Sequence, residues 1–130
     1  MNLVELGESK TEKNIMMLNN SSWELEFFDA AKNWRKYQFE NILKYIKSSV
    51  LEVGPGTGNN VQYYRDKASE ITLLEINKHM SNLLKYKFEG DQKVTVQNSD
   101  IYSQERKFDT ILYMDVLEHI EDDKNEINRA

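Results

Sequence analysis

A short apolar segment that runs directly into three alternate glycines constrains this chain more than any other part of its sequence. Residues 50–53, two valines and a leucine around Glu52, suit a β-strand that is buried on both faces. Gly54, Gly56 and Gly58 follow at once. Glycine adopts positive φ readily and has no Cβ, so the backbone of such a turn can approach a ligand closely. The pattern therefore predicts a buried strand that ends in a ligand-binding turn.

The composition is that of an ordinary globular domain. Of the 130 residues, 39% are hydrophobic and 30% are charged, which indicates one domain with a modest core. The chain has no cysteine, which excludes disulfides and thiolate metal sites and fits a reducing compartment. It has neither an apolar run of about eighteen residues nor a basic, apolar leader, so we expect a cytoplasmic location without membrane contact. The net charge of -5 opposes nucleic-acid binding.

Strand and helix patterns alternate along the rest of the chain. Four apolar or alternating segments predict strands at 50–53, 71–76, 93–97 and 108–114. Helical spacing of apolar residues predicts helices at 59–67 and 78–88, the second closed by Gly90. This order predicts an α/β fold of the Rossmann-like kind, a parallel sheet with helices on both faces and right-handed crossovers.

The residues before the first strand differ in character. Residues 1–22 are polar and are expected to form a flexible arm, while residues 23–46 carry apolar residues at helical spacing and predict a helical cap of one long or two short helices. Its aromatic residues either cover the edge of the sheet or roof a substrate pocket. The candidates for the pocket are Phe27, Phe28, Trp34 and Tyr37. The predicted organisation is therefore an arm, a cap and a βα core over about 48–130.

The glycine turn departs from the dinucleotide-binding fingerprint. GxGxxG requires a third glycine where this chain has Asn59, and the third glycine stands at Gly58 instead. Taken alone, the turn suits a nicotinamide or flavin site as well as any other. Together with Glu52 it reads ExGxGxG, which resembles motif I of the class I S-adenosylmethionine-dependent methyltransferases. An acid beside the turn suits a cationic amino-acid group better than a pyrophosphate, so we expect Glu52 to meet the cofactor ammonium directly or through water.

Later segments resemble further elements of the same family. Glu75 lies 23 residues beyond Glu52 at the end of a strand, and the resemblance implies that it accepts hydrogen bonds from both ribose hydroxyls, with Ile76 against the adenine. Asp100 and Ile101 match the next adenine-binding element. Each residue also has a structural alternative, a solvated strand end for Glu75 and a helix cap or a turn residue for Asp100. The resemblance implies a cofactor site made of Glu52, Gly54, Pro55, Gly56, Gly58, Glu75, Ile76, Asp100, Ile101 and Asp115.

Residues 108–120 resemble motif IV of the family, and their VLEHI ending resembles the branch that includes quinone-biosynthesis enzymes. Asp109 precedes the buried part of its strand and is expected to be structural. His119 is the candidate general base, the alternative being a helix-face residue without a catalytic role. Asp115, Glu118 and His119 partly resemble the ExxEH metal arrangement of some methyltransferases, but Asp115 replaces its first Glu and no metal is predicted.

The resemblance implies an S-adenosylmethionine-dependent enzyme that methylates a small molecule. The family has seven strands and this chain supplies four, so we interpret it as the cofactor-binding half of a longer enzyme, truncated after the fourth strand. The unpaired edge of that strand predicts self-association. Two alternatives stay open, a nicotinamide-dependent oxidoreductase, which Asn59 disfavours, and a non-catalytic cofactor-binding or interaction fragment.

Overall fold

A computed structural model describes residues 22–130. The described residues fall into two units, which divide between residues 41 and 42. Almost all of the predicted arm, residues 1–21, lies outside the described residues. The predicted cap forms one helix, α3 (Ser22–Ile42), which is followed by one turn of 3-10 helix, η1 (Leu43–Tyr45).

Part of the α3 surface is aromatic. Trp34 and Tyr37, one turn apart, stack with ring centroids 5.7 Å apart, and 55% and 56% of their surfaces are exposed. Phe27 and Phe28 meet edge to face. A role for these rings in a substrate pocket stays a prediction.

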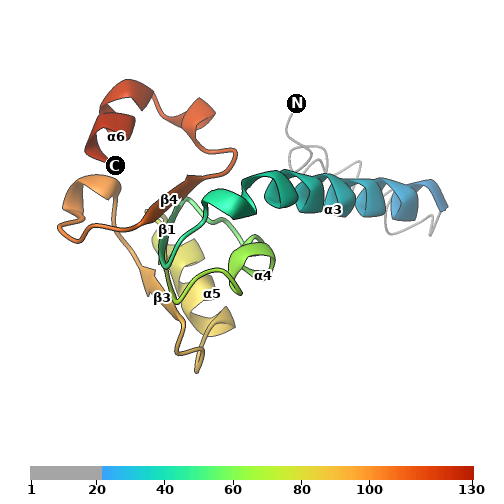
Figure 1. The fold of residues 1–130 in the computed structure, drawn as a ribbon, viewed down its shortest axis with the longest axis horizontal. Coiled ribbons are helices and arrows are strands. Elements are labelled where there is room, and N and C mark those ends of the chain that lie inside the picture. Colours follow the sequence, from blue (N-terminus) through green and yellow to red (C-terminus); the bar gives the residue numbers. More distant parts are fainter. Residues whose placement is uncertain (1–21) are drawn as a thin grey trace. The chain divides into compact units, whose positions relative to one another are not determined.

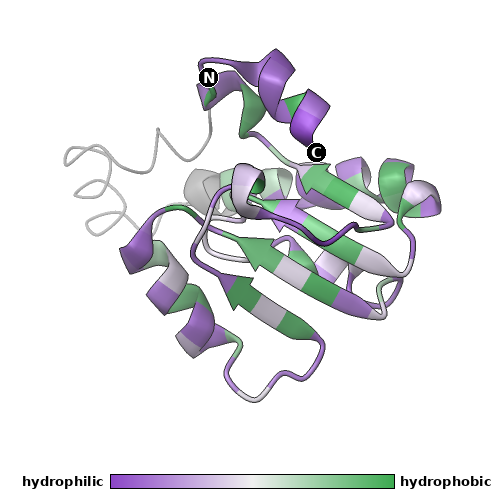
Figure 2. Ribbon diagram, turned by 90° about the vertical axis from the view of Figure 1, so that its left-hand side faces the viewer, coloured by the Kyte–Doolittle hydropathy of each residue, from purple (hydrophilic) through white to green (hydrophobic). Residues whose placement is uncertain are grey.

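The second unit is built on one parallel sheet. Its strands are β1 (Ser49–Val53), β2 (Glu70–Leu74), β3 (Val94–Gln97) and β4 (Thr110–Tyr113), in the spatial order β3-β2-β1-β4. All three strand pairs are parallel, which confirms the predicted fold class. Figure 2 shows hydrophobic residues along all four strands, as expected where both faces of a sheet are covered.

Three strands are shorter than the sequence predicts, and β3 differs only in that it begins at Val94 instead of residue 93. We expected the second strand to reach Ile76, but β2 ends at Leu74 because Asn98 Nδ2 donates to the carbonyl oxygens of Glu75 (2.8 Å) and Ile76 (2.9 Å). The Asn98 side chain thus takes the place of a backbone partner on a neighbouring strand for these two carbonyls. The predicted strand at 108–114 narrows to Thr110–Tyr113 for a similar reason, since the Asp109 carboxylate accepts from the Ser49 N–H at 3.0 Å.

The helices of the second unit follow the predicted order with different lengths. The predicted helix at 59–67 is regular only over α4 (Val61–Tyr64), whereas α5 (Lys78–Lys87) matches its prediction. The Asn77 side chain caps α5 by accepting from the Met80 N–H at 3.0 Å, and Gly90 takes φ +79 beyond its end. The remaining elements are η2 (Ile101–Ser103), η3 (Leu117–His119) and α6 (Asp123–Arg129).

The two faces of the sheet carry different partners. On one face the register aligns Glu52 with Leu73 and Leu112. On this face the Tyr64 hydroxyl of α4 donates a hydrogen bond to the Glu52 carboxylate. On the other face lies a buried apolar cluster of Leu51, Val53, Leu74 and Ile101. Three partly buried side chains, Phe108, Ile111 and Tyr113, pack against this cluster. Figure 1 shows α4 and α5 on one side of the strands and α6 on the other.

The strand order determines where a ligand can bind. From β1 the chain moves outward through β2 and β3, and then returns to β4 on the opposite side of β1. In open parallel sheets, ligands bind at the carboxyl ends of the strands where this reversal occurs. The turn after β1 and the segment after β4 lie at that point.

None of the helices in residues 22–130 combines the length and the apolar character needed to cross a membrane.

Candidate functional site

The glycine turn leaves β1 as a tight backbone turn. The Gly54 N–H donates to the Leu74 carbonyl at 2.9 Å, which continues the sheet, and the Gly58 N–H donates to the Pro55 carbonyl at 2.9 Å. This second bond closes a four-residue β-turn with Gly56, at φ +56, in its first central position. Positive φ at that position is the reason that a turn of this shape prefers glycine.

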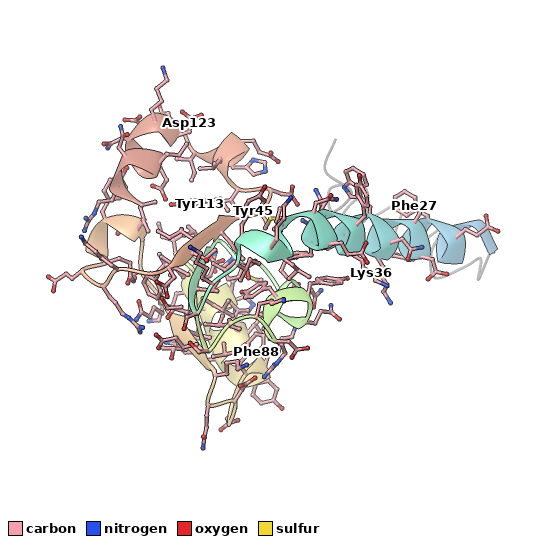
Figure 3. The ribbon with its side chains drawn as sticks, in the orientation of Figure 1. Phe27, Lys36, Tyr45, Phe88, Tyr113 and Asp123 are labelled. Atoms are coloured by element: carbon pink, nitrogen blue, oxygen red, sulfur yellow. The ribbon has the colours of Figure 1, made fainter. Side chains whose placement is uncertain are left out.

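The three glycines have different surroundings. A Cβ on Gly54 would lie 2.9 Å from Val116 Cγ2, and a Cβ on Gly58 would lie 2.7 Å from Phe88 Cε2. Figure 3 labels Phe88 just beyond α5. A Cβ on Gly56 would meet no heavy atom within 4 Å. Gly54 and Gly58 therefore allow close internal packing, and Gly56 alone faces open space in which a ligand can approach the backbone.

Glu52 lies beneath this turn, with only 1% of its surface exposed. Its Oε1 accepts from Asn60 Nδ2 at 2.8 Å, and its Oε2 accepts from the Tyr64 hydroxyl at 2.6 Å. Burial, together with the Glu52 charge, raises the pKa of the Tyr64 phenol far above its ordinary value, so the hydroxyl stays a donor.

A contact between Glu52 and the cofactor ammonium is expected from the sequence and stays a prediction. The structure gives both carboxylate oxygens partners within the chain, so Glu52 also joins β1 to α4. Asn60 and Tyr64 are site-forming residues that the sequence analysis missed. Tyr64 lies within the helix predicted at 59–67, where the apolar spacing places it on the buried face, and its hydroxyl at a buried position is the signal that could have indicated a polar partner.

Glu75 and Ile76 follow β2 at the same edge of the sheet. Glu75 is 8% exposed, and its Oε1 accepts from the Asn77 N–H at 2.8 Å. In the part of the chain that the structure describes, no group donates to its second carboxylate oxygen. Ile76 is 74% exposed, which is unusual for a large aliphatic side chain beside a buried strand. An acceptor oxygen and an uncovered apolar side chain therefore belong to the two consecutive residues that follow β2.

Asp100 and Ile101 follow β3. Asp100 Oδ1 accepts from the Ser103 N–H at 3.0 Å and from Ser103 Oγ at 2.9 Å, so the predicted helix-cap alternative is confirmed for this oxygen. Ile101 is 3% exposed and packs in the apolar cluster with Leu51 and Leu74. Its side chain is used in the core, which leaves its backbone as the part that can contact a ligand.

Asp115 and His119 follow β4. Asp115 is exposed and takes φ +59, and no other non-glycine residue among residues 22–130 has positive φ. It precedes Val116, whose side chain lies so close to Gly54 that a Cβ there would be 2.9 Å from Val116 Cγ2. The segment after β4 therefore packs against the glycine turn. The His119 side chain is 58% exposed, with Nε2 3.6 Å from Glu118 Oε1. Its role as a base stays a prediction.

Within the described range, no three His, Cys, Asp or Glu side chains are grouped so that they could hold a metal ion.

Asp109 has the structural role that was predicted. Its Oδ2 accepts from the Ser49 N–H at 3.0 Å and from Ser49 Oγ at 2.8 Å, at the opposite edge of the sheet from the glycine turn.

Two hollows of the described residues bear on the position of the site. The smaller, of about 230 Å³, lies between the glycine turn and α5 and is lined by Gly56, Thr57, Met80, Leu83, Leu84 and Lys87. The larger, of about 340 Å³, lies beside Phe108 and Ile111 and includes only Ile101 of the predicted cofactor residues. The smaller hollow likewise includes only Gly56 of the predicted cofactor residues, and we place the candidate site there because Gly56 belongs to the glycine turn that follows β1.

The sheet order, the glycine turn at the chain reversal and an acid after each of β2, β3 and β4 together define a domain of the Rossmann-like methyltransferase class. Residues 18–130 match a family model described as a methyltransferase domain, and the chain belongs to this family.

Individual relatives agree with this assignment. A curated relative, ribosomal RNA small subunit methyltransferase A of Alkaliphilus metalliredigens, is 35% identical over 52 residues, which are 40% of this chain and 18% of the relative. A putative methyltransferase of Bacillus halodurans superposes with a TM-score of 0.62 at 14% identity, over 73% of this chain and 44% of that one. The N-methyltransferase NodS of Bradyrhizobium japonicum, in complex with S-adenosyl-L-homocysteine, gives a TM-score of 0.63 at 18% identity, over 86% and 60%.

The chain thus spans less than two thirds of each of these proteins. At these identities the two solved structures establish the shared fold.

Proposed function

We propose that this chain is the cofactor-binding half of an S-adenosylmethionine-dependent methyltransferase that acts on a small molecule. The observation that carries the proposal is the pairing of the Glu75 carboxylate with the uncovered Ile76 side chain, at the sheet edge that also holds Gly56. Family membership supports the reaction class.

The donor set fits the cofactor. A nucleoside needs an acceptor for its ribose diol and an apolar surface for its base, and Glu75 and Ile76 supply these two features. The open space at Gly56 admits a ligand next to the backbone. In this proposal Asp100 and the Ile101 backbone meet the base, and Glu52, Gly54, Pro55, Gly58 and Asp115 complete the site, Glu52 acting largely by holding α4 under the turn.

S-adenosylmethionine supplies an activated methyl group on a sulfonium. The protein needs to orient the acceptor and exclude water, and such positioning supplies about 7 to 11 kcal/mol in favourable cases. His119 is our candidate for taking a proton from a hydroxyl acceptor. Because the chain has no cysteine, we also propose the reducing cytoplasm as its location.

Calorimetric titration of the full chain with S-adenosylhomocysteine and with NADH tests the proposal. We expect binding of S-adenosylhomocysteine alone. Binding of NADH alone would support the oxidoreductase alternative, and binding of neither would support the non-catalytic interaction fragment.

Substitution of Glu75 tests the assignment of the ribose site. Glu75→Ala should weaken S-adenosylhomocysteine binding by about 1.5 to 3 kcal/mol, the usual value of hydrogen bonds to a charged group. Glu89→Ala, at an exposed position beyond α5, is the matched control and should bind normally. An unchanged affinity for Glu75→Ala would remove this residue from the site.

An RNA acceptor is the second candidate, because the curated relative that is 35% identical over 52 residues is a ribosomal RNA methyltransferase. The net charge of -5 disfavours phosphate contacts. Titration of the chain with a ribosomal RNA hairpin at two salt concentrations separates the candidates. We expect weak binding, whereas tight binding that falls steeply with salt would favour RNA.

A further inference from the structure

Lys87 connects the end of α5 to the glycine turn. Its Nζ donates to the Thr57 carbonyl at 2.8 Å and to Asn59 Oδ1 at 2.8 Å. These partners precede Lys87 by 30 and 28 residues in the chain. The ammonium also lies 5.6 Å from the centroid of the Phe88 ring, the same ring that packs on Gly58. Nothing in the linear sequence pattern indicates this connection.

The position of Thr57 explains why such a connection matters. Thr57 lies between Gly56 and Gly58, which both have positive φ, and it is the second central residue of the turn closed by Pro55 and Gly58. Glycine loses more backbone freedom on ordering than any other residue. A turn with glycines on both sides of one residue is therefore costly to hold in a single conformation, and the Lys87 ammonium fixes the carbonyl of that residue, Thr57.

Asn59 supplies the second anchor. It stands where the dinucleotide-binding fingerprint has its third glycine, and a glycine there has no side chain to accept from Lys87. The departure from the fingerprint thus has a structural consequence in this chain. The ammonium is also favourably placed at the carboxyl end of α5, where helix carbonyls carry partial negative charge.

We propose that Lys87 is a positioning residue of the cofactor site, which holds the glycine turn ready for S-adenosylmethionine through Thr57 and Asn59. The proposal rests on the proposed function. Lys87 is exposed, and exposed polar contacts add little to global stability. Its effect is therefore local to the turn and acts on the affinity for the cofactor, since a preordered turn loses less entropy when the ligand binds.

The experiment compares Lys87→Met with Lys85→Met. Lys85 lies in the same last turn of α5 and is exposed, and its side chain makes no hydrogen bond to any described residue. Calorimetric titration with S-adenosylhomocysteine should show about threefold to tenfold weaker binding for Lys87→Met and unchanged binding for Lys85→Met. Asn59→Ala should weaken binding less, and the loss for the double variant should be smaller than the product of the two single losses.

Amide hydrogen exchange without any ligand is the second measurement. In Lys87→Met the Gly58 amide should exchange faster, because its bond to the Pro55 carbonyl is no longer supported, while the amide of Leu51 in β1 keeps its protection. Purely global destabilisation would increase exchange at both amides.

Weaker binding together with faster Gly58 exchange supports the proposal. Normal affinity or unchanged Gly58 exchange in Lys87→Met overturns it, and so does an equal loss of affinity in Lys85→Met. If the unsubstituted chain does not bind S-adenosylhomocysteine, the proposed function and the cofactor role of Lys87 both fail, and the exchange result then measures only whether Lys87 orders the turn.

Discussion

Gly56 and Gly58 adopt similar backbone conformations, with φ +56 and +76, but only Gly58 is enclosed by other residues. Alanine at either position adopts an unfavourable left-handed conformation, which costs roughly 1 to 2 kcal/mol. At Gly58 the new Cβ would also overlap the Phe88 ring and Leu84 Cδ2. The two positions therefore separate the contribution of the turn to stability from its contribution to binding.

Gly58→Ala should accordingly lower the free energy of unfolding by more than Gly56→Ala, as measured by urea denaturation. Gly56→Ala should instead reduce binding of S-adenosylhomocysteine, because its Cβ enters the open space above the turn. Equal stability of the two variants would contradict the packing role of Gly58, and full binding by Gly56→Ala would contradict a ligand at that space.

Tyr64 allows a second prediction at the same scale. Tyr64→Phe removes the bond to the buried Glu52 carboxylate and should cost about 1 to 3 kcal/mol of unfolding free energy. Because the folded state raises the pKa of Tyr64 above 10.0, its contribution is full below that pH and is lost as the pH rises further.

The stability of the unsubstituted chain should therefore fall more steeply above pH 10.0 than that of Tyr64→Phe, when both are followed by urea denaturation across the alkaline range. Tyr86→Phe, at a side chain that is 81% exposed, is the control. A parallel decline for Tyr64→Phe and the unsubstituted chain would argue against the Tyr64 contribution.

At the scale of elements, Asp109 joins β4 to β1. Hydrogen bonds from the backbone and then the side chain of Ser49 lower the pKa of the Asp109 carboxyl below its ordinary value of 3.8. The carboxylate therefore contributes stability that is fully present above pH 3.8 and is lost as the pH falls through the lowered folded pKa.

Asp109→Asn should make the chain less stable at neutral pH and should flatten the loss of stability below pH 3.8, measured by thermal unfolding at a series of pH values. Asp66→Asn is the control, because Asp66 is exposed and forms no hydrogen bond with a described residue. An acid limb that stays equally steep in Asp109→Asn would show that the two strands are not joined in this way.

The lengths of the elements show where local patterns stop being sufficient. The apolar pattern of residues 71–76 continues through Ile76, but β2 ends at Leu74 because the Asn98 side chain takes the next two carbonyls. Asn98 is separated from Ile76 by 22 residues, so no window along the chain reveals the competition. The helix predicted at 59–67 is likewise longer than the observed α4 (Val61–Tyr64), because the contacts that end it are not visible in the local apolar pattern.

At the scale of the whole molecule, β4 pairs with β1 on one side, and no other described strand pairs with it. Unpaired strand edges are sites of association. We expect sedimentation velocity to show self-association that increases with chain concentration. A single monomeric species at high concentration would refute association through this edge.

The sequence by itself determined the class of fold, the turn after β1 and the acids at the strand ends, because apolar runs, glycine spacing and strand-end charges are local properties of the chain. Even the likeness to the methyltransferases rested on such short segments. The tertiary structure decided which glycine is open, what Glu52 and Ile101 contact, and that Lys87 reaches Thr57. Those outcomes depend on side chains that are distant in sequence and meet only when the helices pack on the sheet, where distance and burial select among partners that the linear pattern leaves equivalent.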